Sequence, residues 1–202
     1  MKKIKEITDD EMISVFLKTE ISSNRWSKAI IDLLEKDQKD RAIVDNPNLT
    51  SREENNYRKK LLGNFRGYGK NDLLFSNFPH DVRWIRARLS KEELKEVKYI
   101  NYGYWNELSK YTRLPKVGAE TILSGERIFD QSNDGFIKAA AAIKKGVKFP
   151  EMILVSTDEK SNLVVLEGHL RITAYFLVPD YIPDGLEVII GYSKDMSRWD
   201  SF

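Results

Sequence analysis

The sequence predicts an α+β chain in which a helical amino-terminal region, residues 1–79, packs on a region built around a small mixed sheet, residues 80–202. Two patterns lead to this prediction. In the first region apolar residues recur every three or four positions, which is the spacing of one helix face. In the second region short apolar runs are interspersed with helical stretches, as in chains that pack helices on a sheet. A chain of 202 residues that is 41% hydrophobic can bury a sizeable core.

Two helical segments are expected in the first region. Thr8 and Glu11 form a capping box ahead of an apolar stripe that continues to about residue 36. The connector at residues 37–50 ends in DNPNLT, whose residue types favour turns. Ser51 and Glu54 then form a second capping box before another apolar stripe, and a cluster of glycines ends that helix.

Strands are expected to dominate the second region. Residues 82–89 alternate in character, with Ile85, Ala87 and Leu89 on one face of the expected strand. A helix is predicted at residues 134–146, which contain four consecutive alanines and end in two lysines. Three further apolar runs are predicted to be strands, at residues 152–155, 163–166 and 186–190.

Composition excludes several classes of protein. The 33 basic and 31 acidic residues give a formal charge of +2, so a polyanion site would have to be local. The absence of cysteine excludes disulfides and thiolate chemistry, and two histidines give no support to a zinc cluster. No signal peptide and no apolar run of membrane-spanning length is present. We therefore expect a soluble, cytoplasmic protein without a membrane partner.

The run LVVLEGHLRITAYFL predicts a buried strand, a glycine turn and the start of a helix. The strand pattern ends at Glu167 and Gly168, and a helical pattern begins directly afterwards. His169 and Arg171 then fall in the first helical turn, where unpaired backbone N–H groups and the positive end of the helix dipole attract anions. The Arg171 guanidinium suits phosphate oxygens. A simpler interpretation is that Gly168 only ends a strand and that Arg171 pairs with Glu167. The spacing of the residues does not decide between an anion site and this structural turn.

The same run resembles the signature of the ParB/sulfiredoxin-like superfamily. In that signature a strand ends in an acidic residue and glycine, and a helix then opens with histidine or glutamate, an arginine and a later alanine. The matching residues here are Glu167, Gly168, His169, Arg171 and Ala174. The resemblance covers about residues 134–193, including the expected hairpin before the motif and the strand after its helix. It implies a ParB/sulfiredoxin-like domain at residues 80–202.

The resemblance also implies a ligand. In that superfamily the motif's turn holds nucleotide phosphates, and its members include CTP-binding partition proteins, sulfiredoxins, free serine kinases and ParB-like nucleases. His169 stands where sulfiredoxins carry their cysteine, so reduction of sulfinic acid is excluded. Leu170 departs from the histidine or arginine that relatives place there. We expect a nucleoside di- or triphosphate with Mg²⁺, and phosphotransfer or hydrolysis are the reactions that such a site could support.

Roles at this site follow from the needs of phosphoryl chemistry. Arg171, His169 and the helix amides would compensate phosphate charge, and Glu167 is the candidate base or metal-linked carboxylate. Thr173, one turn after His169, could present its hydroxyl to the same ligand. Structural alternatives are an ion pair between Glu167 and Arg171 and a plain surface position for Thr173.

Three residues elsewhere are candidates for the wall of the same cleft. Arg113 lies in the loop of KYTRLP, and it could instead cap a helix end. Ser132 and Asn133 precede the predicted helix at 134–146, and duty as a helix cap would explain both of them.

A basic segment at residues 51–70 supports an alternative function. Arg58, Lys59, Lys60 and Arg66 are interleaved with aromatic residues, a combination that can neutralise backbone phosphates while rings stack on unpaired bases. The alternative is a nucleic-acid-binding or ParB-like nuclease module, although such a helix is more often an ordinary solvated face. A second alternative is a non-catalytic domain for protein interaction.

Overall fold

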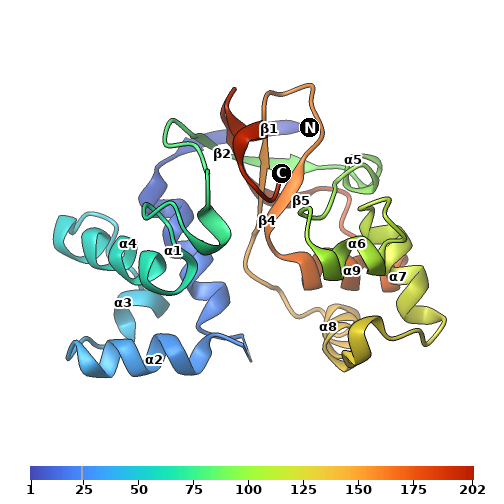
Figure 1. Ribbon diagram of the computed structural model, residues 1–202, viewed down its shortest axis with the longest axis horizontal. Coiled ribbons are helices and arrows are strands. Elements are labelled where there is room, and N and C mark those ends of the chain that lie inside the picture. The colour runs from blue at the N-terminus through green and yellow to red at the C-terminus, as the bar shows by residue number, and fades with distance from the viewer. Residues whose placement is uncertain (24) are drawn as a thin grey trace.

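The computed structural model describes residues 1–23 and 25–202, and this part of the chain forms one five-stranded mixed sheet with helices on both faces (Figure 1). The sheet has the order β1-β2-β5-β3-β4. Neighbouring strands run antiparallel except for β3 and β5, which are parallel. The strands are β1 (Lys2–Ile7), β2 (Arg83–Leu89), β3 (Met152–Ser156), β4 (Val164–Glu167) and β5 (Leu186–Tyr192).

One face of the sheet is covered by the helices that lie between β1 and β2 (Figure 1). Phe16 of α1 and Leu62 of α4 pack in the same core cluster as Trp84, Ile153 and Ile189 of the sheet. These helices are α1 (Asp9–Glu20), α2 (Ser27–Lys36), α3 (Ala42–Asp45) and α4 (Arg52–Arg66).

The opposite face carries a second core cluster, in which Ile85, Leu154 and Ile190 pack with Ile172 of α9. Helices α7 and α8 pack in turn on α9. Trp84 and Ile85 are neighbours in β2 but contribute to different clusters, as the alternation of a strand requires. The helices after β2 are α5 (Lys91–Lys95), α6 (Gly103–Leu108), α7 (Pro115–Leu123), α8 (Asp134–Lys144) and α9 (His169–Leu177).

The expected α+β class, the strands at 82–89, 152–155, 163–166 and 186–190, and the helix at 134–146 are confirmed within a residue or two. Thr8 caps α1 as a full capping box, while Ser51 accepts the Glu54 amide without the reciprocal bond. The expected helical stretch from Thr8 divides into α1 and α2, and residue 24, which it also covers, lies outside the described residues.

The sheet includes a strand from each side of the expected boundary at residue 79. Strand β1 was not predicted, and it pairs with β2 so that the sheet takes its first strand from the amino terminus. Five of its six residues are exposed, and lysines at positions 2, 3 and 5 hide the alternation on which sequence reasoning relies. Lysines on an edge strand also discourage pairing with another molecule. Residues 8–82 are therefore inserted between two paired strands.

Along residues 1–23 and 25–202, no helix combines the length and apolar character needed to cross a membrane.

Gly67, which ends α4, offers a test of this packing. It has φ +85°, and a Cβ added there would lie 1.9 Å from the backbone oxygen of Asp72. Gly125 has φ +82° with nothing within 4 Å of an added Cβ. We expect Gly125→Ala to lower the free energy of unfolding by about 1 kcal/mol through backbone strain alone. Gly67→Ala should cost at least about 2 kcal/mol more, because the backbone must also move. Equal losses in urea denaturation would contradict this prediction.

Candidate functional site at the start of helix α9

Strand β4, Gly168 and helix α9 form the strand, turn and helix expected from the sequence. Gly168 is the N-cap of α9 with φ +115°, and a Cβ there would lie 2.7 Å from Met152 Cγ. Only glycine adopts this backbone easily. The first backbone bond of the helix runs from the Ile172 amide to the Gly168 carbonyl, 3.0 Å long. The amides before it have no acceptor within the helix, and glycine offers no capping side chain.

Arg171 folds back over this turn and is 5% exposed. Its Nη1 donates to the Pro150 carbonyl at 2.5 Å, and its Nη2 donates to Glu167 Oε1 at 3.1 Å. An added Cβ at Gly168 would lie 3.1 Å from that same Nη2, so the guanidinium sits directly against the turn. The simpler sequence interpretation, an ion pair between Glu167 and Arg171, is confirmed. Most of the donor capacity of Arg171 is thus used within the protein.

His169 lies under two aromatic rings. Its ring stacks on Trp105 of α6 with a centroid separation of 4.8 Å and 17° between the planes, and on Tyr99 at 6.1 Å. Burial lowers the pKa of His169 to about 3, and the charges of Arg66 and Arg171 lower it further in the same direction. The imidazole is therefore neutral at physiological pH, whereas the sequence interpretation used it to compensate phosphate charge. Its Nε2 is buried without a hydrogen-bond partner in the described part of the chain.

Thr173 does not face a ligand. It is fully buried, and its hydroxyl contacts the His169 carbonyl at 2.7 Å and the Tyr99 hydroxyl. Thr173 therefore contacts the backbone of His169 from inside the core. Its burial fits neither the expected ligand contact nor the alternative of a surface position.

Two charged residues from the helical insertion complete the site. Glu20 ends α1 and Arg66 ends α4, and Arg66 Nε lies 3.3 Å from Glu20 Oε1. The charge of Arg66 acts on His169, and the charge of Glu167 acts on both Glu20 and Arg66. Segments that are about a hundred residues apart in sequence thus meet at the start of α9. We call Glu20, Arg66, Glu167, His169 and Arg171 the turn cluster.

Glu20 is the residue of the turn cluster that can change its charge near neutral pH. Its side chain is almost fully buried, and this burial, followed by the negative charge of Glu167, raises the pKa of Glu20 to about 7. Arg66 and the Ser23 hydroxyl oppose the shift without cancelling it. A carboxyl group with this pKa can give or take a proton at physiological pH.

The three cleft candidates serve mainly structural contacts. Arg113 donates to the carbonyls of Tyr99 and Phe202, and so ties the loop before α7 to the carboxyl terminus. The Ser132 hydroxyl accepts the Asp134 amide, and Asn133 donates its side-chain amide to the Glu126 carbonyl. Both residues precede α8, whose Gly135 lies against Leu170 of α9.

The basic residues of the nucleic-acid alternative do not share one surface. Arg58 is 1% exposed, and its guanidinium donates to the Ile43 and Asn48 carbonyls and to Glu54. Arg66 belongs to the turn cluster, and only Lys59 and Lys60 are exposed. Arg58 occupies the apolar stripe of α4, so helix geometry directs it inward.

A groove of about 820 Å³ runs beside α9, and Arg171 and Tyr175 form part of its wall. Ligand sites for small molecules have volumes of this order. The loop before β3 supplies Lys148 and Phe149, and Tyr181 also lines the groove. A ligand larger than phosphate therefore has room next to Arg171.

The described residues of the turn cluster do not form a ready set of ligands for Mg²⁺. In residues 1–23 and 25–202 no group of three or more His, Asp or Glu residues could hold a metal ion. Glu20 faces Arg66 and Glu167 faces Arg171, so each carboxylate is engaged by a guanidinium.

Sequence reasoning missed Glu20 and assigned Arg66 to another function. A signal for Glu20 was present, because it continues the stripe that includes Met12, Phe16 and Leu17, and a carboxyl on a buried stripe needs a partner. No spacing rule identifies that partner, since Arg66 arrives from another helix.

Replacement of Arg171 tests its structural role. We expect Arg171→Met to lower the free energy of unfolding by about 3 kcal/mol, because it leaves Glu167, whose side chain is only 15% exposed, without its partner. Arg88→Met, which breaks the exposed pair with Glu187, should cost at most about 1 kcal/mol. Arg171→Met combined with Glu167→Gln should recover part of the loss. Similar losses for the Arg171 and Arg88 variants would show that the turn does not depend on the guanidinium.

The imidazole of His169 should stay neutral over a wide pH range. We expect its NMR signals to remain unchanged from pH 8 to pH 5, and His169→Phe identifies them, because the chain has only two histidines. Since the folded pKa lies below the unfolded value of about 6.5, this residue's contribution to stability is present above that pH and is lost as the pH falls toward 3. A titration with a midpoint between pH 5 and pH 7 would contradict the stacking described above.

When the chain was compared with known proteins, no protein-family model, no curated protein and no solved structure matched it.

Proposed function

We propose that the protein binds a phosphate-bearing ligand, a nucleotide, at the start of α9, and that it is a member of the ParB/sulfiredoxin-like superfamily. The motif from Glu167 to Ala174 supports the family, because it resembles that superfamily's signature and forms a strand, a glycine turn and a helix. Backbone amides at a helix start attract anions, and here two guanidinium groups lie beside them.

The observation that carries this proposal is the position of Arg66. Its side chain is 16% exposed and its Nε is buried without a hydrogen bond in the described residues, although Glu20 lies at 3.3 Å. The Arg66 Nε therefore faces Glu20, whereas part of the side chain stays exposed. Phe16 and Trp26 hold the guanidinium by cation–π contacts, at 5.9 and 5.0 Å from the ring centroids. Arg66 is therefore preorganised, and the exposed part of its side chain can meet a ligand oxygen.

Glu20 would make anion binding depend on pH. When Glu20 is ionised, the carboxylates of Glu20 and Glu167 balance the guanidinium groups of Arg66 and Arg171. When Glu20 is protonated, the turn cluster has one positive charge in excess, because His169 is neutral. An anion should therefore bind more tightly below pH 7. If phosphotransfer or hydrolysis occurs at this site, Glu20 is suited to exchange the proton, because its pKa is raised to about 7.

Binding of sulfate, whose charge is constant between pH 6 and pH 8, tests this proposal. Glu20, whose pKa in the folded protein is about 7, loses its proton as the pH rises through 7 and then adds a negative charge to the site. The affinity for an anion should therefore fall over this pH range. We expect calorimetric affinity for sulfate to be about tenfold higher at pH 6 than at pH 8. ATP and CTP with Mg²⁺ should raise the melting temperature, with a gain of ~2.7 kcal/mol at a hundredfold excess over the dissociation constant.

Variants separate the contributions of the turn cluster. Glu20→Gln should bind sulfate at pH 8 as tightly as the unaltered protein does at pH 6, and Arg66→Met should abolish binding. Arg41→Gln, which removes an exposed arginine before α3, is the control for loss of one positive charge. The proposal fails if no anion stabilises the protein at either pH, or if Arg66→Met binds normally.

The same assay decides the alternatives. Binding of single-stranded DNA or RNA with a steep salt dependence, lost when Lys59 and Lys60 are neutralised, would favour the nucleic-acid module. Indifference to anions and nucleic acids would favour an interaction domain.

A further inference from the structure

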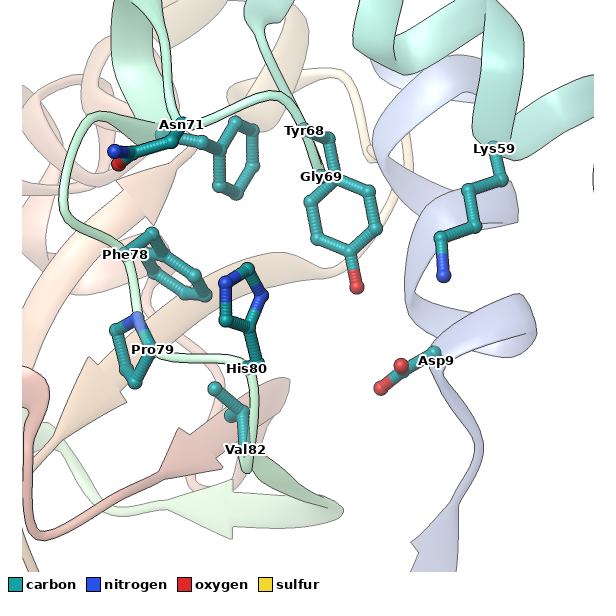
Figure 2. A pocket seen from close by; sticks show the side chains of 10 residues that line it. Asp9, Lys59, Tyr68, Gly69, Asn71, Phe78, Pro79, His80 and Val82 are labelled. Atoms are coloured by element: carbon teal, nitrogen blue, oxygen red, sulfur yellow. The ribbon is translucent and has the colours of Figure 1, made fainter.

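A second cavity, of about 140 Å³, lies at the other end of α1 (Figure 2). Asp9 begins α1, whereas Glu20 of the turn cluster ends it, so the two sites are about 16 Å apart along the helix. The wall comes from the start of α1, from α4 with the segment that follows it, and from the residues that lead into β2.

Four polar side chains converge on this cavity. Figure 2 shows Asp9, Lys59, Tyr68 and His80 directed toward a common space. The Tyr68 hydroxyl lies within hydrogen-bonding reach of the Asp9 carboxyl, and Lys59 Nζ lies 5.8 Å from the centroid of the Tyr68 ring. Asp9 and Lys59 carry opposite charges and share one cavity, and in the part of the chain that the structure describes they stay beyond ion-pair distance. A carboxylate can accept about four hydrogen bonds, so Asp9 and Lys59 can both still bind a ligand placed between them.

The Asp9 end of the cavity is backed by a buried donor. Partial burial raises the pKa of the Asp9 carboxyl, and hydrogen bonding from the indole N–H of Trp84 and from the Tyr68 hydroxyl opposes this shift without cancelling it. Trp84 is 2% exposed, and its indole N–H has no partner other than Asp9 in the described residues. A cationic group placed on Asp9 would relieve this cost.

Apart from Gly69 and Asn71, the remaining wall is apolar. Phe75, Phe78, Pro79 and Val82 face the same space. A cavity of about 150 Å³ accommodates benzene, so this one has room for about six non-hydrogen atoms. Such a volume fits a molecule of the size of alanine and is too small for a nucleotide. A simple anion would be repelled by Asp9 and a simple cation by Lys59.

We propose that this cavity binds a small zwitterion, an α-amino acid with a short side chain. The ammonium group of the ligand lies on the Asp9 carboxylate, and its carboxylate accepts from Lys59 and His80. The short side chain packs on Phe78 and Val82. This site takes a different class of ligand from the turn cluster and does not depend on the nucleotide proposal.

Titration of the full chain with alanine, followed by NMR of the backbone amides, tests the inference. We expect saturable shifts at Gly69 and at the amides around Asp9 and His80, with a millimolar dissociation constant. Propionate and ethylamine, which each carry one of the two charged ends, should bind at least about tenfold more weakly, since each leaves one charge of the cavity unpaired. Glycerol, which carries hydroxyls alone, should also bind at least about tenfold more weakly.

Matched variants locate the two charges. Asp9→Asn and Lys59→Met should each weaken alanine binding at least about tenfold. Lys60→Met, which removes the next exposed lysine of α4, should not. The melting temperature of each variant shows whether it remains folded, and His80→Gln provides a second test, with weaker carboxylate binding expected. The inference is overturned if alanine produces no saturable shift, if propionate, ethylamine or glycerol binds as tightly as alanine, or if Asp9→Asn or Lys59→Met retains normal affinity.

Discussion

The pairing of β1 with β2 is the constraint on which the rest of the structure depends. It anchors the amino terminus to one edge of the sheet, and Thr8 caps α1 immediately after that strand. The direction of α1 is therefore fixed, and its last residue, Glu20, reaches the turn that follows β4. Helix α4 packs on α1 and brings Arg66 to the same place. The edge strand and the apolar core that Phe16 and Leu62 share with the sheet together hold the helical insertion in place relative to α9.

The turn cluster is an unusual use of buried charge. Desolvation of two carboxylates and two guanidinium groups is costly, and replacement of buried ion pairs by apolar side chains is often neutral or stabilising. A cluster of this kind is therefore weak evidence for stability. Strongly shifted pKa values at a helix start are more typical of a functional site. Burial shifts the pKa values of both Glu20 and His169, and neighbouring charges add to these shifts.

Much of the fold could be predicted because its patterns are local. The alternation of residues 82–89 placed Ile85 and Trp84 on opposite faces correctly, and the alanine-rich helix α8 was evident from composition. Strand β1 escaped prediction because an exposed edge strand has no buried face to produce alternation. The basic segment was misleading for a related reason: a count of charges does not show that Arg58 points into the core.

The sequence by itself determined the strand, the glycine turn and the helix around Gly168, because a positive φ and a change of apolar spacing are properties of neighbouring residues. Only the tertiary structure decided what that turn contains. Arg171 is held by carbonyls of the loop before β3, His169 is neutral beneath Trp105, and Arg66 arrives from the other side of the sheet. The burial of these side chains and the charges around them depend on groups that are far away in the sequence, so no local pattern can predict them.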